Sequence, residues 1–211
     1  AIQNYKTAIN LKPDHFEAIN NLGATLLETG KPGEAIALLT ELVETHPHYG
    51  PGFNNLGLAL TSISDYQKSM ENFALAVSKS PEDMSFWENL GTSLSAPGLS
   101  FAKYDSFYET IFLNLLNKQT THNPSMIAPS IIRFLLNNPI FAKYINEDSD
   151  KKNESGFYIQ AINDLSELPL LTKLMELCPL SDLRIEKLFT KCRKEFLLNF
   201  HLLDDLQRPI Q

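Results

Sequence analysis

A short motif recurs every 34 residues in the first half of the chain, and it restricts the possible folds more than any other feature. The motif reads Asn20-Asn21-Leu22-Gly23, then Asn54-Asn55-Leu56-Gly57, then Glu88-Asn89-Leu90-Gly91, and a proline keeps the same spacing at Pro13, Pro47 and Pro81. A fixed period of this length is typical of proteins built from stacked supersecondary units. An accidental phase shared by Leu, Gly and Pro is improbable, so we expect a repeat architecture.

Each period contains two stretches with the spacing of amphipathic helices. Apolar residues lie three and four positions apart, at Ile19, Leu22 and Leu26 in the first stretch and at Ala35, Leu38, Leu39 and Leu42 in the second. Between them, residues 28–33 read Glu-Thr-Gly-Lys-Pro-Gly, which predicts a helix end followed by a turn. No alternating strand pattern is present. The sequence therefore predicts an all-α fold of helix-turn-helix repeats.

These markers resemble the tetratricopeptide repeat, whose pattern has Trp, then Leu-Gly, an aromatic residue, and later Ala, Phe and Pro. The matching residues are Trp87, Leu90, Gly91, Phe53, Leu56, Gly57, Phe73, Ala76, Pro81, Ala1, Tyr5, Ala8 and Pro13. The departures are apolar exchanges, at Ile19, Leu26, Leu60, Leu94, Leu39 and Leu42. The resemblance implies a short right-handed solenoid over residues 1–98. It contains the second helix of a truncated repeat, two full repeats and the first helix of a third, so we expect the chain to be a piece of a longer protein.

The second half, residues 99–211, keeps helical spacing without the repeat, and we predict an irregular helical domain there. An apolar stripe from Phe101 to Leu115 predicts one long helix, and further helices are expected at residues 124–136, 139–145, 157–165 and 168–177 and after Ser181.

The charge also differs between the halves. Residues 1–98 hold five Lys and eleven Asp or Glu, net −6, whereas residues 99–211 have a net charge of −1.

Residues 168–200 are similar to the helical connector of bacterial proteins that join tetratricopeptide repeats to a class I methyltransferase domain. The stretch runs from Leu168 to Met175 and from Cys178 to Thr190, with Arg193. The resemblance implies a larger enzyme, an S-adenosylmethionine-dependent methyltransferase, that continues after Gln211. A glycosyltransferase is the alternative for such a parent protein. Gly156 is the only glycine after Gly98, so no glycine-rich turn is available for a cofactor. We expect no catalysis and no cofactor in these 211 residues.

One asparagine recurs at the same place on the first helix of each pair, at Asn21, Asn55 and Asn89. First helices line the concave side of such a stack, so these amides should form a row along a groove. An amide offers donors and an acceptor to the backbone of an extended peptide. The arrangement resembles the asparagine ladder of O-linked N-acetylglucosamine transferase. In the alternative interpretation, these asparagines bond to neighbouring backbone and only stiffen the stack.

Other residues on the same helices complete the predicted groove. They are Asn20 and Asn54, one position before the row, with Glu17, Glu88, Leu27, Leu58 and Thr61. A carboxylate clamp for chaperone tails is excluded, because Glu88 stands where Arg is needed and Ala24 where Asn is needed. The two carboxylates favour a neutral or basic peptide. The expected partner is therefore a protein or an extended peptide.

Several other functions are not favoured by the composition. A formal net charge of −7 does not suit nucleic acid or an anionic membrane, and no apolar run is long enough to span a bilayer. His46 and His48 lack a third metal ligand nearby, and the two cysteines, Cys178 and Cys192, predict reduced thiols in a cytoplasmic protein. Two alternatives stay open. Residues 99–211 could have transferase or cofactor-binding activity of their own, or the solenoid ends could assemble a structural scaffold.

Overall fold

The computed structural model describes residues 1–118, 120, 122–146, 156–180 and 182–206, and within them the regular structure is helical throughout. The chain forms two compact units. The repeat unit comprises residues 1–100 and 117–123, and the C-terminal unit comprises residues 101–116 and 124–211. The sequence placed the division at residues 98 and 99. In the structure it falls after Ser100, and the segment 117–123 returns to the first unit.

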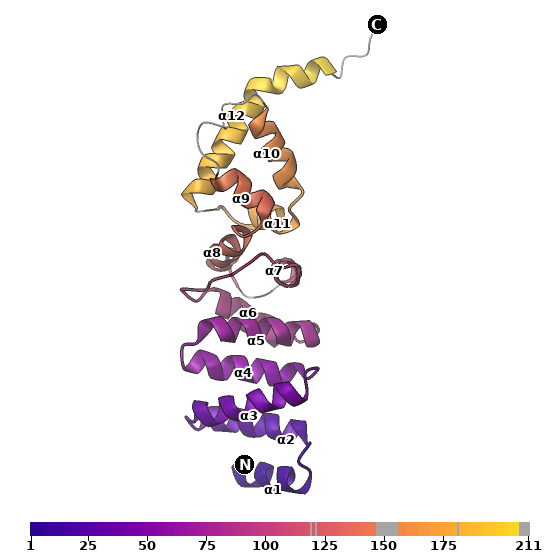
Figure 1. The fold of residues 1–211 in the computed structure, drawn as a ribbon, viewed down its shortest axis with the longest axis vertical. Helices are drawn as coiled ribbons and strands as arrows, with labels where there is room; N and C mark the ends of the chain where they lie inside the picture. Colours follow the sequence, from indigo (N-terminus) through magenta and orange to yellow (C-terminus); the bar gives the residue numbers. More distant parts are fainter. Residues whose placement is uncertain (119, 121, 147–155, 181, 207–211) are drawn as a thin grey trace. The chain divides into compact units, whose positions relative to one another are not determined.

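The repeat unit is a stack of antiparallel helices, as the 34-residue period predicted (Figure 1). Its helices are α1 (Ile2–Leu11), α2 (Phe16–Glu28), α3 (Pro32–Thr45), α4 (Gly50–Ser62), α5 (Tyr66–Lys79) and α6 (Met84–Leu94). Each helix packs against the next along the chain, and α2 also contacts α4, as α4 contacts α6. The predicted all-α solenoid is confirmed.

Local sequence fixes where these helices start and stop. Proline occupies the first turn of α3 and of α4, where its missing N–H would have no helical partner in any case. Asp65 and Asp83 cap α5 and α6, and their carboxylates accept hydrogen bonds from the backbone N–H groups of Lys68 (3.2 Å) and Ser85 (2.9 Å). After α2, Gly30 has a φ of +75°, a conformation that glycine adopts without strain.

The repeated Leu-Gly pair allows the two helices of a repeat to approach closely. A Cβ at Gly23 would lie 2.6 Å from Cγ of Leu39, and one at Gly57 would lie 2.7 Å from the Phe73 ring. Both distances are shorter than carbon atoms tolerate. The glycine is therefore required by the side chain that packs over it from the second helix of the same repeat.

Within the described residues, α6 is not followed by a second helix of the repeat, and Lys118 and His122 contact α6 instead. A Cβ at Gly91 would collide with the His122 ring, which occupies the position held by Leu39 and Phe73 in the earlier repeats. The His122 Nε2–H donates to the Glu88 carbonyl at 2.6 Å and lies 3.1 Å from the Glu88 carboxylate. The ammonium of Lys118 lies 4.9 Å from the centroid of the Trp87 ring. The side chains of His122 and Lys118, which lie outside the repeat in sequence, thus cover the face of α6 on which a second helix would pack.

The C-terminal unit contains the remaining helices. They are α7 (Ser106–Asn117, whose last residue belongs to the repeat unit), α8 (Pro124–Leu135), α9 (Pro139–Asn146), α10 (Phe157–Ser166), α11 (Pro169–Leu177) and α12 (Leu183–Leu206). Helix α10 packs on α9, α11 and α12, and α11 also packs on α8. Tyr144 of α9 is buried and donates a hydrogen bond to Asp164 of α10, which lowers the pKa of the Asp164 carboxyl. This bond ties α9 to α10.

The predicted long helix from residue 101 is wrong in its first turn and a half. Helix α7 begins at Ser106, and the Asp105 carboxylate accepts the backbone N–H of Phe107 at 2.9 Å, which is a cap rather than a helical position. Phe101 and Tyr104 lie in the preceding loop, yet their rings still pack on Phe134 of α8, with centroids 5.4 and 4.8 Å away. The loop therefore packs on α8 the same aromatic rings that suggested a helix, and both rings are half-buried.

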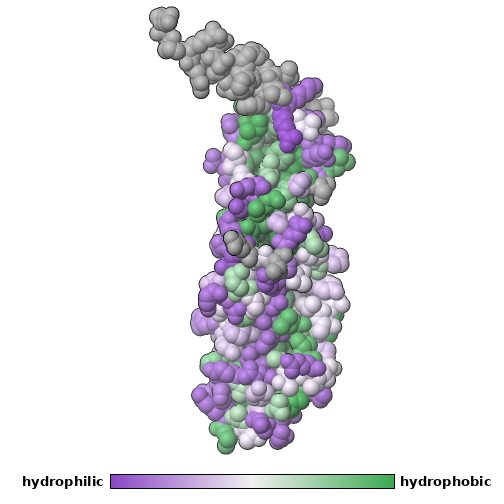
Figure 2. Space-filling model, turned by 180° about the vertical axis from the view of Figure 1, so that it is seen from behind, coloured by the Kyte–Doolittle hydropathy of each residue, from purple (hydrophilic) through white to green (hydrophobic). Residues whose placement is uncertain are grey.

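The two units differ in how much apolar side chain they expose. Among the described residues, nine large apolar side chains are exposed, and six of them are in the C-terminal unit: Met126, Ile140, Ile159, Met175, Leu177 and Leu183. Figure 2 shows a band of hydrophilic residues along the visible face of the repeat unit. Within the described part of the chain, no helix has both the length and the apolar character needed to cross a bilayer.

Candidate functional site

The first helices of successive repeats carry the predicted peptide-binding residues. We use the name asparagine row for Asn21 on α2, Asn55 on α4 and Asn89 on α6. Residues four and three positions apart share one face of a helix, so Glu17 and Ala24 flank Asn21. The equivalent neighbours in the next two repeats are Pro51, Leu58, Ser85 and Thr92. The row is thus part of a face that all three first helices present in register.

Hydrogen bonds between side chains connect the row to the repeat before it. The Asn55 Nδ2–H donates to Oδ1 of Asn20 at 2.9 Å, and the Asn89 Nδ2–H donates to Oδ1 of Asn54 at 2.8 Å. Asn20 and Asn54 are buried, with 6% and 8% of their surface exposed. Sequence reasoning placed all five asparagines on this surface but missed this pairing. The signal was present, because each bond joins residues 35 apart, one more than the period.

The row keeps unused hydrogen-bonding capacity. An amide has two N–H donors and an oxygen with two lone pairs, and these bonds take one donor each from Asn55 and Asn89. Both side chains are half-buried, so part of each amide still faces solvent. Asn21 is exposed, and no side-chain hydrogen bond of its amide occurs among the described residues. The row therefore presents amide groups held in position by the stack, with Asn21 fully available.

Each of the two predicted carboxylates lies next to a histidine. Oε2 of Glu17 lies 3.0 Å from Nδ1 of His15, and Glu88 contacts His122 as described above. Burial raises the pKa of the Tyr49 hydroxyl, and the negative charge of Glu17 raises it further. The two carboxylates are on α2 and α6, so they occupy opposite ends of the row rather than one site.

The predicted apolar walls are half-buried on the first helices. Leu27 is on α2, and Leu58 and Thr61 are on α4. The hydroxyl of Thr61 donates to the Gly57 carbonyl at 2.9 Å and lies 2.6 Å from Oγ of Ser69 on α5. Because the Thr61 hydroxyl is engaged within the repeat, only its methyl group is available to a ligand. Leu58, on the same face as Asn55, is better placed for contact.

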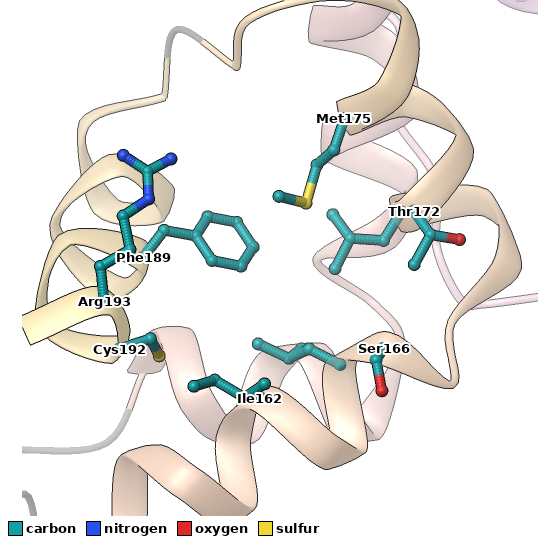
Figure 3. Close-up of a pocket in the computed structure, with 9 residues that line it drawn as sticks. Ile162, Ser166, Thr172, Met175, Phe189, Cys192 and Arg193 are labelled. Carbon is teal, nitrogen blue, oxygen red and sulfur yellow. The ribbon is translucent and has the colours of Figure 1, made fainter. Parts of the chain in front are cut away.

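The C-terminal unit contains an apolar cavity of about 400 Å³ between α10, α11 and α12. Figure 3 shows Ile162, Met175 and Phe189 around the cavity, while the hydroxyls of Ser166 and Thr172 point away from it. Cys192 also lines it, and burial raises the pKa of its thiol to about 11. A protonated thiol is a weak nucleophile. The described lining therefore offers a hydrophobic surface and no activated group.

Cys192 should react slowly with thiol reagents. With a pKa of about 11, only about one thiol in 10⁴ is ionised at pH 7, and the side chain is 2% exposed. The rate of alkylation by iodoacetamide should rise about tenfold per pH unit between pH 7 and 10. Mass spectrometry of a Cys178→Ser variant measures this rate for Cys192 alone. Full alkylation within minutes at pH 7 would contradict the buried position of the thiol.

The histidines expected not to bind metal have other contacts. The His46 ring lies 5.2 Å from the Phe16 ring, and its Nδ1 lies 2.9 Å from the hydroxyl of Thr45, while His48 is exposed. In the part of the chain that the structure describes, no three His, Cys, Asp or Glu side chains gather as metal ligands would.

Comparison with known proteins identifies the repeat. Residues 1–30 match the family model described as a TPR repeat. Over 123 residues, 58% of this chain, the sequence is 27% identical to BBSome complex member bbs-4 of Caenorhabditis elegans and 26% identical to Protein FlbA of Caulobacter vibrioides. The matched part covers 27% and 21% of those proteins, so the chain spans about a quarter of their length.

Solved structures with some similarity include MamA and YrrB. MamA residues 41 to the end from Desulfovibrio magneticus RS-1 is 27% identical, with a TM-score of 0.40 over 44% of this chain and 52% of that one. YrrB, described as a TPR protein with an unusual peptide-binding site, is 14% identical, with a TM-score of 0.43 over 84% of this chain and all of the other. Residues 1–30 thus match a TPR repeat, and the 34-residue period and the stacked helix pairs continue the same helix-turn-helix arrangement as far as α6.

Proposed function

We propose that this chain is a protein-binding module whose repeat unit holds an extended peptide along the asparagine row. The observation that carries the proposal is the regular placement of Asn21, Asn55 and Asn89, one per repeat, with their amides in part open to solvent. A peptide in extended conformation has free backbone N–H and C=O groups along its length. Amides at a repeating interval match that pattern whatever the side chains of the peptide are.

The packing of the first helices supports a groove on this side. Helices α2, α4 and α6 contact one another along the stack. Contacts of comparable extent between second helices, α1 with α3 or α3 with α5, are not found among the described residues. Elements that approach more closely lie on the inner side of a curved stack. This difference favours a concave surface formed by the first helices, which carry the row.

The bonds from Asn55 to Asn20 and from Asn89 to Asn54 serve both the stack and the ligand. They connect neighbouring repeats, as the stiffening interpretation expects, and they also fix the orientation of the two amides before a peptide arrives. Less rotamer entropy is then lost on binding. The two interpretations are compatible. Asn21 distinguishes peptide binding from stiffening of the stack, because its amide has no such bond among the described residues.

The expected affinity is modest. A hydrogen bond contributes about 0.5–1.5 kcal/mol after exchange with water, so three rungs supply about 1.5–4.5 kcal/mol. Micromolar binding needs about 8 kcal/mol, so Leu58 and other apolar contacts must supply the rest. Glu17 and Glu88 favour a neutral or basic peptide over an acidic one.

We infer the kind of protein that contains this module from residues 168–200, which resemble the helical connector described above. That stretch supports the proposal that the chain serves as the substrate-recognition part of a larger methyltransferase-like enzyme in the cytoplasm.

A second candidate function, cofactor binding by the C-terminal unit itself, is favoured by its apolar cavity. Thermal-shift measurements with S-adenosylmethionine and nucleotide sugars test that candidate, because a bound cofactor raises the melting temperature.

The test of peptide binding starts with selection from a random peptide library displayed on phage, followed by fluorescence polarisation with a selected peptide. Changing Asn21, Asn55 and Asn89 together to Ala should weaken binding roughly 10- to 10³-fold, the equivalent of three lost rungs. The single variant Asn21→Ala should weaken it by about two- to tenfold with no loss of stability, since its amide is exposed.

Asn10→Ala provides the matched control, because Asn10 is an exposed asparagine on α1, away from the row. Its affinity should equal that of the wild type. If the triple variant binds selected peptides as tightly as the wild type does, the row has no part in binding, and the cross-repeat bonds are purely structural.

A further inference from the structure

A second cavity, of about 460 Å³, opens between α1, α2 and α3 in the repeat unit. Its apolar lining includes Ile9 of α1, Ile19 of α2, and Leu38 and Leu42 of α3. Two carboxylates, Asp14 and Glu41, belong to the same lining. The cavity is separate from the asparagine row, because Ile19 and Asn21 are two residues apart and therefore point in directions about 200° apart around α2.

The repeat itself explains why this cavity exists. Ile19 occupies the position at which the next two repeats have Phe53 and Trp87, whose rings are 8% and 1% exposed. The indole N–H of Trp87 donates to the Pro81 carbonyl at 2.9 Å, and the equivalent of Pro81 here is Pro13, which lines the cavity. Ile19 is only half-buried. The smaller side chain leaves open the space that an aromatic ring fills in the later repeats.

The carboxylates of Asp14 and Glu41 are the acidic groups of the described lining, which also contains the imidazole of His46. Asp14 and Glu41 are exposed, and neither forms an ion pair or a side-chain hydrogen bond among the described residues. Lys and Arg do not contribute to the described lining. The surrounding residues 1–98 have a net charge of −6. An apolar opening beside two carboxylates complements a large apolar side chain next to a cation, and it repels anionic lipid or nucleic acid.

We propose that this cavity binds a partner protein through a short basic and apolar segment. One large apolar or aromatic side chain of the segment enters the space next to Ile19. A neighbouring Arg or Lys then faces Asp14 and Glu41. The site goes beyond the proposed function, because it adds a second, sequence-selective contact on a different face from the row, which recognises backbone.

The probe for this site is a fluorescein-labelled pentapeptide, Arg-Leu-Trp-Leu-Arg, titrated with the full chain in fluorescence polarisation. Two matched probes keep one property each. Glu-Leu-Trp-Leu-Glu keeps the apolar residues and reverses the charge, and Arg-Ser-Ser-Ser-Arg keeps the charge. Burying one large apolar side chain is equivalent to roughly 10- to 100-fold in affinity, so Arg-Ser-Ser-Ser-Arg should bind at least about tenfold more weakly. Glu-Leu-Trp-Leu-Glu should also bind more weakly, because its carboxylates would face Asp14 and Glu41 and be repelled by them.

The decisive variant is Ile19→Trp, which places in this repeat the residue that the third repeat already has. The new ring should fill the cavity and donate its N–H to the Pro13 carbonyl, as Trp87 does to Pro81. We expect a melting temperature at or above that of the wild type and a loss of binding of at least about tenfold. Ile19→Phe, the residue of the second repeat, is the backup if the indole does not fit.

Charge variants test the predicted contact between a basic residue of the segment and the two carboxylates, Asp14 and Glu41. Changing Asp14 to Asn together with Glu41 to Gln should weaken binding about three- to tenfold, the effect of two exposed ion pairs. Changing Glu28 and Glu82 to Gln removes the same charge from exposed positions outside the cavity and should leave the affinity unchanged. The titrations are repeated with the triple variant in which Asn21, Asn55 and Asn89 are changed to Ala, so that binding to the row is weakened and the remaining affinity reports the cavity. The preference for the basic apolar probe should persist in that variant.

The proposal is overturned if the filled variants, Ile19→Trp or Ile19→Phe, fold and bind the probe as the wild type does. It is equally overturned if the acidic probe binds as tightly as the basic one. Equal losses in the two charge pairs would show that the probe senses only the net charge of the protein, which would also contradict a built site.

Discussion

Replacing Trp87 with Ala should lower the free energy of unfolding by about 3–5 kcal/mol, the usual cost of removing a large buried aromatic side chain. Trp87 is 1% exposed, its indole N–H bonds to the Pro81 carbonyl, and Lys118 lies over its ring. The change therefore removes buried area, a hydrogen bond and the contact that holds part of the segment 117–123. Urea unfolding followed by far-UV circular dichroism measures the loss, since Trp87 is the only tryptophan of the chain.

Trp87→Phe separates the contributions. Phenylalanine keeps most of the buried ring but cannot donate to Pro81, so the loss should be smaller, on the order of 1–2 kcal/mol. Ile19→Ala, at the equivalent position of the first full repeat, should also cost less than Trp87→Ala because Ile19 is only half-buried. Equal destabilisation at positions 19 and 87 would contradict the different packing of the two repeats.

Adding a single methyl group at Gly57 should destabilise the repeat unit by about 1–3 kcal/mol, the typical cost of overpacking. In Gly57→Ala the new Cβ would lie 2.7 to 3.0 Å from three carbons of the Phe73 ring. That ring is 2% exposed, so neighbouring side chains must shift if it is to move away. Helices α4 and α5 must then separate, which weakens the contact that defines the repeat. Thermal and urea unfolding of the full chain measure the effect.

Gly33→Ala is the matched control, because Gly33 lies within α3 and a Cβ there would meet no atom within 4 Å. Alanine favours a helix over glycine by about 1 kcal/mol, so this variant should be neutral or more stable. The double variant Gly57→Ala with Phe73→Leu should recover part of the loss, since leucine is smaller than the ring. Destabilisation by Gly33→Ala equal to that of Gly57→Ala would contradict the close-approach explanation.

The repeat unit could be predicted from sequence because its signals are local and periodic. Leu22, Leu56 and Leu90 fix the phase, and Gly30 and the prolines fix the ends of the helices. Four helices of the C-terminal unit, α8 to α11, also begin and end within a few residues of their expected ranges. Ser181, after which the last helix was expected, lies outside the described residues.

Contacts between distant segments were not predictable in this way. No pattern in the sequence indicates that His122 covers Gly91, because a histidine in a loop has no periodic neighbours to reveal its partner. The aromatic spacing of Phe101 and Tyr104 imitated a helix, whereas the carboxylate of Asp105 starts the helix later. In the candidate site, the residue types were predictable from the period. The bonds from Asn55 to Asn20 and from Asn89 to Asn54 join residues 35 apart, a spacing that the sequence contains, but only the stacking geometry shows that this spacing brings the two amides together.

The central claim, that amides of the asparagine row pair with a peptide backbone, is tested most directly by the side-chain amide signals themselves. Asparagine-selective ¹⁵N labelling lets the Nδ2 resonances be followed by NMR while a phage-selected peptide is added. The account predicts that the Asn21, Asn55 and Asn89 signals shift together and saturate at the peptide affinity, with Asn4 and Asn10 unchanged. Saturable binding that leaves those three signals in place would contradict it.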